Sequence, residues 1–299
     1  MKKILSYGSL NVDMVYSMPH FVQPGETIAA YKMERFPGGK GLNQSVALSR
    51  AGAKVWHGGK IAPDGKWLSD ILEKSGADVS FLSSSGSSTG TATIQVAPSG
   101  ENCIILNHGA NYENTKEEID EAFKSFGAGD ILLLQNEINL LPYLIEKAAE
   151  KGMEIALNPS PIDENLMKMD LSAVRYLILN EIEGEAITGR KEPEEICRTL
   201  LERYPNMKVV LTMGGDGALY MDKDSTYRQS IFEVKAVDTT GAGDTFTGYF
   251  LAFISAGKTV PEALKAASKA AAIAVSRNGA AASIPEREEV LAAELVEKA

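Results

Sequence analysis

The sequence predicts an α/β protein of three layers, with helices on both faces of a mostly parallel central β-sheet, and a small additional β-sheet. Three observations support this fold class. Short apolar runs that end in polar residues alternate with helical patterns along most of the chain, as in parallel sheets covered by helices. Glycines follow several predicted helices, where they favour a helix end. Two extended segments punctuated by proline and glycine interrupt the alternation and would form the extra sheet.

The composition limits the class of protein. The 299 residues are 44% hydrophobic and 23% charged, which suits one large core and a small accessory domain. The net charge of −10 argues against a nucleic-acid surface, which needs clustered Lys and Arg. No apolar run reaches transmembrane length and Met1–Lys3 leads directly into a strand, so we expect a cytoplasmic protein without a membrane partner. Cys103 and Cys197 lie far apart, so neither a disulfide framework nor a zinc site is predicted.

The first strand leads to a candidate binding position. Residues 4–10 read as an apolar strand and a Gly-Ser turn, which place Asn11 and Asp13 at the carboxyl end of the strand. Open parallel sheets bind their ligands at this end. Two short polar side chains suit a polyhydroxylated ligand, although an Asx turn explains the same pair equally well.

The extra sheet is predicted from two segments of the chain. Residues 14–35 are extended, with a turn at Pro24-Gly25, and residues 91–96 and 102–106 form a hairpin. Together these segments would make a lid over the site. Such a lid excludes water, which competes with a substrate hydroxyl for phosphate.

A glycine-rich stretch lies between the two lid segments. Residues 36–44 bring Lys40 and Asn43 onto the first turn of a helix that Gly52 ends. Glycines allow a close approach of the backbone, and the two polar side chains would bind hydroxyl groups. The stretch lacks the spacing of a Walker A loop, so an anion site must lie elsewhere.

The middle of the chain continues the alternation of helix and strand. Helices are predicted over 64–74, 116–125 and 140–151, and strands over 130–137 and 154–157. Because the carboxyl ends of parallel strands share one sheet edge, Glu137 is expected near Asn11 and Asp13.

Two further strands end in polar or glycine-rich segments. Asn180 and Glu183 follow the strand that begins at residue 175, and they could order Mg²⁺-bound water around nucleotide phosphates. A helix-capping box fits their spacing equally well. The glycine turn within 212–217 could pack against a flat base, or it could simply close a hairpin.

The strongest candidate for chemistry is the stretch Val237–Phe246, in which glycines open a long apolar helix. Free backbone amides and the positive end of the helix dipole can hold an anion there, with phosphate as the obvious ligand. Asp244 would then accept the proton of an attacking hydroxyl in phosphoryl transfer, although an Asp in a first helical turn can serve only as a cap. The later loop 274–285 offers carbonyl groups that could bind a hard monovalent cation beside Asp238 and Thr240.

These motifs together resemble the ribokinase-like (PfkB) family of carbohydrate kinases over essentially the whole chain. The resemblance is carried by an ordered set of short motifs, each weak alone: Asn11-Val12-Asp13, Gly38-Gly39-Lys40-Gly41-Leu42-Asn43-Gln44, Thr89-Gly90, Gly109-Ala110-Asn111, Leu157-Asn158-Pro159-Ser160-Pro161, Asn180-Glu181-Ile182-Glu183 and Asp238-Thr239-Thr240-Gly241-Ala242-Gly243-Asp244.

The resemblance implies ATP-dependent phosphorylation of the terminal 5-hydroxyl of ribose, with Mg²⁺ and a K⁺ activator. Asp244 would be the base, and Gly241, Ala242 and Gly243 the anion hole. The sugar site would comprise Asn11, Val12, Asp13, Gly39, Lys40, Gly41, Leu42, Asn43, Glu137 and Asp244. The nucleotide site would comprise Asn180, Glu183, Thr212, Met213, Gly214, Gly215, Asp216, Gly217, Gly243, Asp244 and Ser268, with Glu183 serving the Mg²⁺-phosphate region. Potassium would bind at Asp238, Thr240, Ala274, Arg277, Gly279 and Ser283.

The resemblance also implies a division of the chain. Residues 1–11, 37–87 and 109–299 would form the α/β core that binds nucleotide and sugar. Residues 12–36 and 88–108 would form the lid, and family members commonly form homodimers through it.

Two departures from the family pattern bear on the sugar. Ile61-Ala62-Pro63-Asp64-Gly65 stands where a Gly-Asp-Asp run is frequent, and His108 precedes Gly109 near the expected sugar site. Another pentose, fructose or a nucleoside is therefore an alternative to ribose.

A catalytically silent nucleotide or sugar sensor on the same fold is the alternative of another class. A dinucleotide-binding oxidoreductase is disfavoured, because Gly241–Phe246 lacks the third glycine and lies late in the chain.

Overall fold

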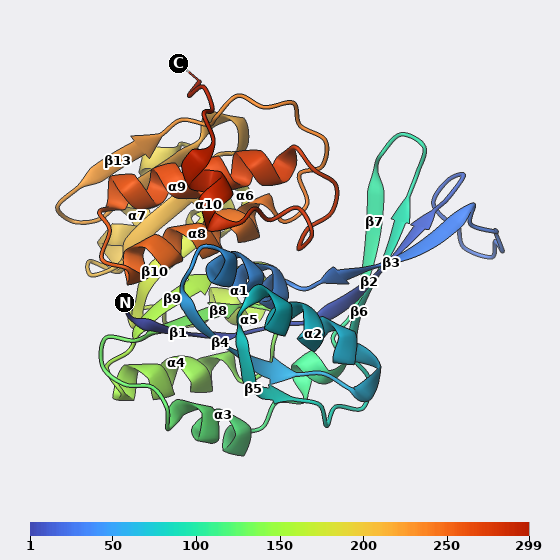
Figure 1. Cartoon of the computed structure of the whole chain (residues 1–299), viewed down its shortest axis with the longest axis horizontal. Helices are drawn as coiled ribbons and strands as arrows, with labels where there is room; N and C mark the ends of the chain where they lie inside the picture. Colours follow the sequence, from blue (N-terminus) through green and yellow to red (C-terminus); the bar gives the residue numbers. More distant parts are fainter. Residues whose placement is uncertain (299) are drawn as a thin grey trace.

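The computed structural model describes residues 1–298 and is built on a nine-stranded sheet (Figure 1). The strand order is β13-β12-β11-β10-β9-β8-β1-β4-β5. Neighbouring strands are parallel, except that β12 is antiparallel to both β11 and β13. The bounds of these strands are β1 Lys3–Tyr7, β4 Lys54–Lys60, β5 Asp78–Ser83, β8 Ile131–Gln135, β9 Glu154–Asn158, β10 Val174–Asn180, β11 Lys208–Thr212, β12 Ala218–Met221 and β13 Thr226–Gln229.

Helices cover both faces of this sheet, which gives the predicted three layers (Figure 1). The α-helices are α1 Lys40–Arg50, α2 Lys66–Ser75, α3 Lys116–Phe123, α4 Leu141–Glu150, α5 Glu164–Met167, α6 Glu181–Thr188, α7 Pro193–Arg203, α8 Ala242–Ser255, α9 Val260–Val275 and α10 Arg287–Ala292, and short 3₁₀ turns span Pro63–Gly65 (η1), Gly109–Tyr112 (η2) and Gly214–Asp216 (η3). Among residues 1–298, no helix has the length and apolar character needed to cross a membrane.

Alternation along the strands divides the core between the two faces. Ile4 and Leu133 pack with α1, α2, α8 and α9 in one apolar cluster, whereas Leu5 and Leu132 pack with α3, α4 and α7 in a second cluster. Successive side chains of a strand point to opposite faces, so the almost wholly apolar central strands supply both clusters.

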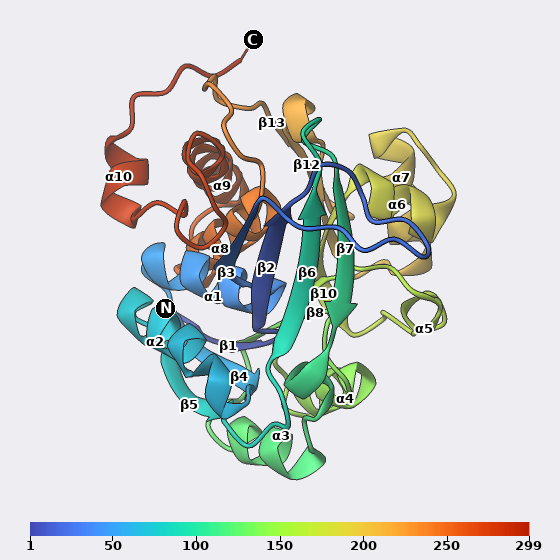
Figure 2. The same ribbon diagram turned by 90° about the vertical axis from the view of Figure 1, so that its right-hand side faces the viewer.

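A four-stranded sheet projects from one side of the body (Figures 1 and 2). Its order is β3-β2-β6-β7, with β2 Asn11–Ser17, β3 Lys32–Gly38, β6 Gly90–Val96 and β7 Asn102–Asn107. The predicted hairpin is present, since β6 pairs antiparallel with β7. The predicted fold class, with its second small sheet, is therefore confirmed.

Helices α1 and α8 approach each other closely, and their contact positions the site. A Cβ atom added to Gly248 would lie 2.4 Å from the Ala47 side chain and 2.8 Å from the Leu48 amide nitrogen. Glycine at this position therefore lets the two helix backbones meet. One helical turn earlier, the same contact brings the start of α1 against the start of α8, where Asp244 lies.

Candidate active site

The glycine turn before α8 has the backbone geometry of an anion site. Gly241 precedes the helix with a φ of 74°, a left-handed conformation that favours glycine. A Cβ there would also lie 3.0 Å from the Ala280 side chain. Gly243, in contrast, has open space around the position of a Cβ atom. The first turn of α8 thus presents backbone amides toward a space that no side chain fills.

A pocket of about 220 Å³ opens at this turn. It is lined by Lys40, Asn158, Ser160, Ile178, Leu179, Asn180, Glu183, Thr212, Thr239, Gly241, Ala242, Gly243, Asp244 and Thr247. The pocket therefore unites the start of α1, the carboxyl ends of β9, β10 and β11, and the start of α8, as expected for a ligand site at the carboxyl edge of a parallel sheet.

The carboxylate of Asp244 is held by two amides from α1. Asn43 Nδ2 donates to Oδ2 at 3.0 Å, and Gln44 Nε2 donates to Oδ1 at 2.8 Å. Each oxygen of the carboxylate thus accepts one hydrogen bond from a residue about 200 positions earlier in the chain. A carboxylate with this support has a defined direction, as a general base requires.

Lys40 lies among three carboxylates. Burial alone would lower its pKa, but Asp244, Glu137 and Glu183 together raise the pKa above its ordinary value. The lysine therefore stays protonated. A fixed positive charge in the pocket can neutralise a phosphate.

Glu137 is anchored near the amino end of α1. Its Oε2 accepts hydrogen bonds from the Ser9 hydroxyl and from the Lys40 backbone amide, the latter at 3.1 Å. The structure therefore places Glu137 at the start of α1, where this pair of hydrogen bonds holds it; the shared sheet edge predicts a position near Asn11 and Asp13.

Asp13 lies on β2 in the small sheet, beside Gly38 of β3. A Cβ on Gly38 would come within 2.1 Å of both Asp13 carboxylate oxygens, so the absence of a side chain there makes room for the carboxylate. Burial, and then the charge of Glu137, raise the pKa of Asp13 to about 7. Asp13 and Glu137 form an acidic pair suited to accept hydrogen bonds from sugar hydroxyls.

Asn11 is held by Asn111, a residue that was not assigned to the site from the sequence. Asn111 Nδ2 donates to Asn11 Oδ1 at 2.7 Å, and Asn111 Oδ1 accepts from the Leu10 amide at 3.0 Å. These bonds fix the first residue of β2 relative to η2. The Gly109-Ala110-Asn111 motif was the available signal for this role.

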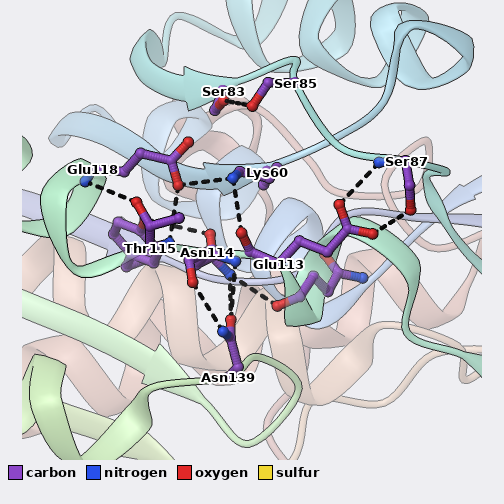
Figure 3. Close-up of polar contacts among 11 residues, drawn as sticks. Lys60, Ser83, Ser85, Ser87, Glu113, Asn114, Thr115, Glu118 and Asn139 are labelled. Carbon is purple, nitrogen blue, oxygen red and sulfur yellow. Dashed lines mark hydrogen bonds and ion pairs between the residues drawn. The ribbon is translucent and has the colours of Figure 1, made fainter.

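A second polar cluster holds the segment that follows η2 (Figure 3). Lys60 Nζ, at the end of β4, lies 2.9 Å from Glu118 Oε2 and donates to the Glu113 carbonyl at 2.7 Å. Asn114 Nδ2 donates to the carbonyl of Asn111 at 2.8 Å and to Asn139 Oδ1 at 3.0 Å. The cluster thereby fixes the backbone that carries Asn111.

Asn180 and Glu183 form the capping box that was one of their two interpretations. The Glu183 amide donates to Asn180 Oδ1 at 2.9 Å, and the Asn180 amide donates to Glu183 Oε2 at 3.0 Å. Both residues also line the pocket, so capping does not remove them from it. Thr212 lines the pocket as well, whereas Met213–Gly217 lie beyond it in the turn around η3 and Ser268 is buried on α9.

The segment after α9 is joined to the stretch before α8. Asp238 Oδ1 accepts from the amide and hydroxyl of Thr240 at 2.9 and 2.6 Å, and its Oδ2 accepts from the Gly279 amide at 2.9 Å. Burial acts to raise the pKa of Asp238, but these hydrogen bonds outweigh it and lower the pKa. Asp238 is thus kept ionised beside this loop.

Ala274, Arg277, Gly279 and Ser283, the remaining residues of the predicted potassium site, lie at the end of α9 and in the segment after it. The Ala274 carbonyl accepts from the Arg277 amide at 3.0 Å. The side chain of Arg277 pairs with Glu289, and the Ser283 hydroxyl donates to the Ala280 carbonyl at 2.8 Å. Within residues 1–298, no group of three or more His, Cys, Asp or Glu side chains is arranged to hold a metal ion. A cation here would depend on backbone oxygens and Asp238.

Several residues that line the pocket were not assigned to the site from the sequence. Thr247 lies one turn after Gly243 on the same helix, so helical periodicity could have identified it. Asn158 and Ser160 belong to a motif that signalled a strand end and the family resemblance. Gln44 does not line the pocket but holds Asp244 from behind; it adjoins Asn43, and only the packing of α1 against α8 reveals its contact with Asp244.

Comparisons with known proteins give consistent results. The model of the pfkB family carbohydrate kinases matches residues 1–287. A ribokinase of Haemophilus influenzae is 36% identical over 97% of this chain and 98% of its own length. A deoxyribokinase of Salmonella typhi is 32% identical, with 94% and 95% covered. The structure of an Arabidopsis thaliana ribokinase complexed with ribose and ATP superposes with a TM-score of 0.85, at 26% identity and with 97% of both chains covered.

Proposed function

The chain belongs to the pfkB family of carbohydrate kinases, and on this premise we propose that it transfers the γ-phosphate of ATP to the 5-hydroxyl of ribose. The observation that carries the proposal is the position of Asp244. Its carboxylate lines the same pocket as the Gly241–Gly243 turn and is oriented by two amides. A base beside an anion site is the arrangement that phosphoryl transfer to a hydroxyl requires.

In the proposed reaction, the residues of this chain position the sugar and move one proton. Asp13 and Glu137 accept hydrogen bonds from sugar hydroxyls, and Asn11, Val12, Gly39, Gly41, Leu42 and Asn43 complete the sugar site. Asp244 takes the proton of the 5-hydroxyl as the sugar oxygen attacks the γ-phosphorus. Lys40 and the amides of Gly241, Ala242 and Gly243 stabilise the negative charge of the phosphoryl group.

The nucleotide would lie along the same pocket. Asn180, Glu183 and Thr212 line it. We assign the nucleobase of ATP to Ser268 on α9 and to the neighbouring turn of Met213, Gly214, Gly215, Asp216 and Gly217. Glu183 would serve the Mg²⁺ ion, which usually binds one or two carboxylates and the substrate phosphates. When bound, Mg²⁺ neutralises phosphate charge. K⁺ would order the loop at Asp238, Thr240, Ala274, Arg277, Gly279 and Ser283.

The small sheet is proposed as both lid and dimer interface. Ile104, Ile105 and Leu106 on β7 are 51%, 60% and 46% exposed, and Phe36 on β3 is 40% exposed. A partner lid would bury these apolar side chains. We expect a homodimer in sedimentation experiments, with Ile105→Lys shifting it toward monomer. Lys124→Ala, at the residue that follows the distant α3, should have no effect. An unchanged dimer in the Ile105 variant would refute this interface.

The identity of the sugar is tested with ATP and a panel of ribose, deoxyribose, fructose and a nucleoside, with ADP release as the measurement. We expect the highest kcat/KM with ribose. Deoxyribose is the specific competitor, because the Salmonella typhi relative is a deoxyribokinase. A higher kcat/KM for another sugar would overturn the assignment to ribose. Binding of sugar and ATP without ADP release would indicate a silent sensor.

Asp244→Asn tests the reaction itself. The amide keeps the size of the side chain but cannot accept the proton, so we expect kcat to fall by roughly 10²- to 10⁴-fold. Sugar and nucleotide binding should change little. A near-normal kcat would remove Asp244 from the role of base. We place this activity in the cytoplasm, which supplies ATP.

A further inference from the structure

Two buried glutamines form a hydrogen-bonded chain that ends on Asp244. Gln44 Nε2 donates to Asp244 Oδ1 at 2.8 Å, and Gln44 Oε1 accepts from Gln135 Nε2 at 2.7 Å. Both glutamines are fully buried, at 0% exposure. An ionised carboxylate only accepts hydrogen bonds, so it determines the direction of both amides. Gln44 must present nitrogen to Asp244 and oxygen to Gln135.

The far end of this chain rests on the central sheet. Gln135 is the last residue of β8 and is paired with Asn158 of β9. Its amide lies against the backbone of Gly8, since a Cβ on Gly8 would come within 2.1 Å of Gln135 Oε1. A residue in a buried parallel strand is a rigid support for the amide that it holds.

Asn43 differs from Gln44 in how its amide is used. Its Nδ2 donates to Asp244 Oδ2 at 3.0 Å, but its Oδ1 is buried and has no partner within residues 1–298. The Asn43 amide therefore has one unpaired end beside Asp244, whereas both ends of the Gln44 amide are engaged within the protein. The two oxygens of Asp244 consequently have different environments.

We propose that Gln44, held by Gln135, is a positioning residue that anchors Asp244 Oδ1 and leaves Oδ2 to accept the proton of the sugar. This inference rests on the proposed function. The sugar oxygen bonds to the γ-phosphorus, the bond from that phosphorus to the bridging oxygen breaks, and its electron pair leaves with ADP. The hydroxyl proton moves to Oδ2. Gln44 keeps its hydrogen bond to Oδ1, so the carboxylate does not rotate during the transfer.

Gln44→Met tests the anchor, because methionine has a similar length but no donor. We expect kcat for ATP and ribose to fall about 10- to 100-fold, as for the loss of one hydrogen bond to a charged group. The KM values should change by less than about twofold, since Gln44 is expected to act on the transition state rather than on binding.

Gln135→Met tests the support. We expect a smaller fall in kcat than for Gln44→Met. The double variant Gln44→Met/Gln135→Met should have the kcat of Gln44→Met alone, because Gln135 acts only through Gln44. Purely structural damage from two buried substitutions would instead accumulate.

Ser45→Ala is the matched control on the same helix. The Ser45 hydroxyl is buried and lies 2.7 Å from His57 Nδ1, so this substitution also removes a buried hydrogen bond, without touching Asp244. We expect a lower melting temperature with unchanged kcat. An equal loss of kcat in Ser45→Ala and Gln44→Met would overturn the positioning role.

The inference and the proposed function fail separately. If Gln44→Met keeps the wild-type kcat while Asp244→Asn loses it, the positioning role is wrong and the kinase assignment stands. If the wild-type protein releases no ADP with any sugar, the proposed function itself is wrong.

Discussion

The Asp238 carboxylate accepts a hydrogen bond from the Gly279 amide at 2.9 Å, across 41 residues of sequence. The same carboxylate binds the amide and hydroxyl of Thr240. One side chain therefore ties the loop after α9 to the stretch that leads into the glycine turn of α8. Order in that loop and order in the proposed anion hole are coupled through Asp238.

This coupling predicts a dependence on the monovalent cation. Replacing K⁺ with Na⁺ at fixed Mg²⁺ should lower kcat severalfold, because Na⁺ is smaller and would be held less well by the backbone oxygens of the proposed K⁺ site. Steady-state rates in the two salts at equal ionic strength provide the measurement. Asp238→Asn, which removes the charge, should weaken the difference between the salts. Equal rates in K⁺ and Na⁺ for the wild-type protein would count against a cation site in this loop.

Gly38→Ala should impair sugar binding without unfolding the protein. The new methyl group would lie 2.1 Å from both Asp13 oxygens. The Asp13 carboxylate would turn away from this clash, because rotation about the side-chain bonds moves it without moving the backbone. We expect the KM for ribose to rise about 10-fold or more, as for lost hydrogen bonds to a charged group, with the KM for ATP unchanged. Gly127→Ala is the control, because open space surrounds that position. A normal ribose KM in Gly38→Ala would separate Asp13 from the sugar site.

The raised pKa of Asp13 predicts that sugar affinity depends on pH. The pKa is about 7 because of burial and of Glu137, so the carboxyl is largely protonated below that pH. Sugar hydroxyls donate to the ionised form, hence binding should strengthen as the pH rises through 7 and should release a proton. Titration calorimetry in buffers of different ionisation enthalpy measures this proton. Asp13→Asn should abolish the release, and an unchanged release in that variant would assign the proton to another group.

The same shift has a consequence for stability in the absence of sugar. The folded state holds the Asp13 proton up to about pH 7, whereas the unfolded chain loses it near the ordinary carboxyl pKa of 3.8. Between these values the folded state binds more protons, so this group makes the free energy of unfolding decrease as the pH rises. Asp13→Asn should flatten that part of the profile in thermal unfolding.

Lys60→Met should destabilise the protein through the cluster in Figure 3. The Lys60 side chain is 7% exposed and pairs with Glu118, which is 31% exposed. Loss of the ammonium group leaves Glu118 and the Glu113 carbonyl without this donor, and we expect a cost of about 2 kcal/mol in urea unfolding. The double variant Lys60→Met/Glu118→Gln should recover part of the loss. If the double variant is no more stable than Lys60→Met, the ion pair does not account for the cost.

Local sequence patterns determined many of the helix ends, strands and turns of this protein. Gly76 ends α2 in a left-handed conformation, the Asn180–Glu183 pair caps α6, and the apolar run before Gln135 forms a buried strand. The glycine turn before Asp244 was recognised for the same reason. Each of these features depends on residues within one or two turns of the chain, so a short window of sequence contains its cause.

The supports of the site were decided by the tertiary structure. Gln44 contacts Asp244 across 200 residues, Asn111 contacts Asn11 across 100, and Ser9 contacts Glu137 across 128. No local periodicity encodes these pairs, because they depend on the close approach of α1 to α8 at Gly248 and on which strands are neighbours in the sheet. Sequence alone therefore identified the candidate groups for the chemistry, whereas long-range packing decided which side chains hold those candidates in place.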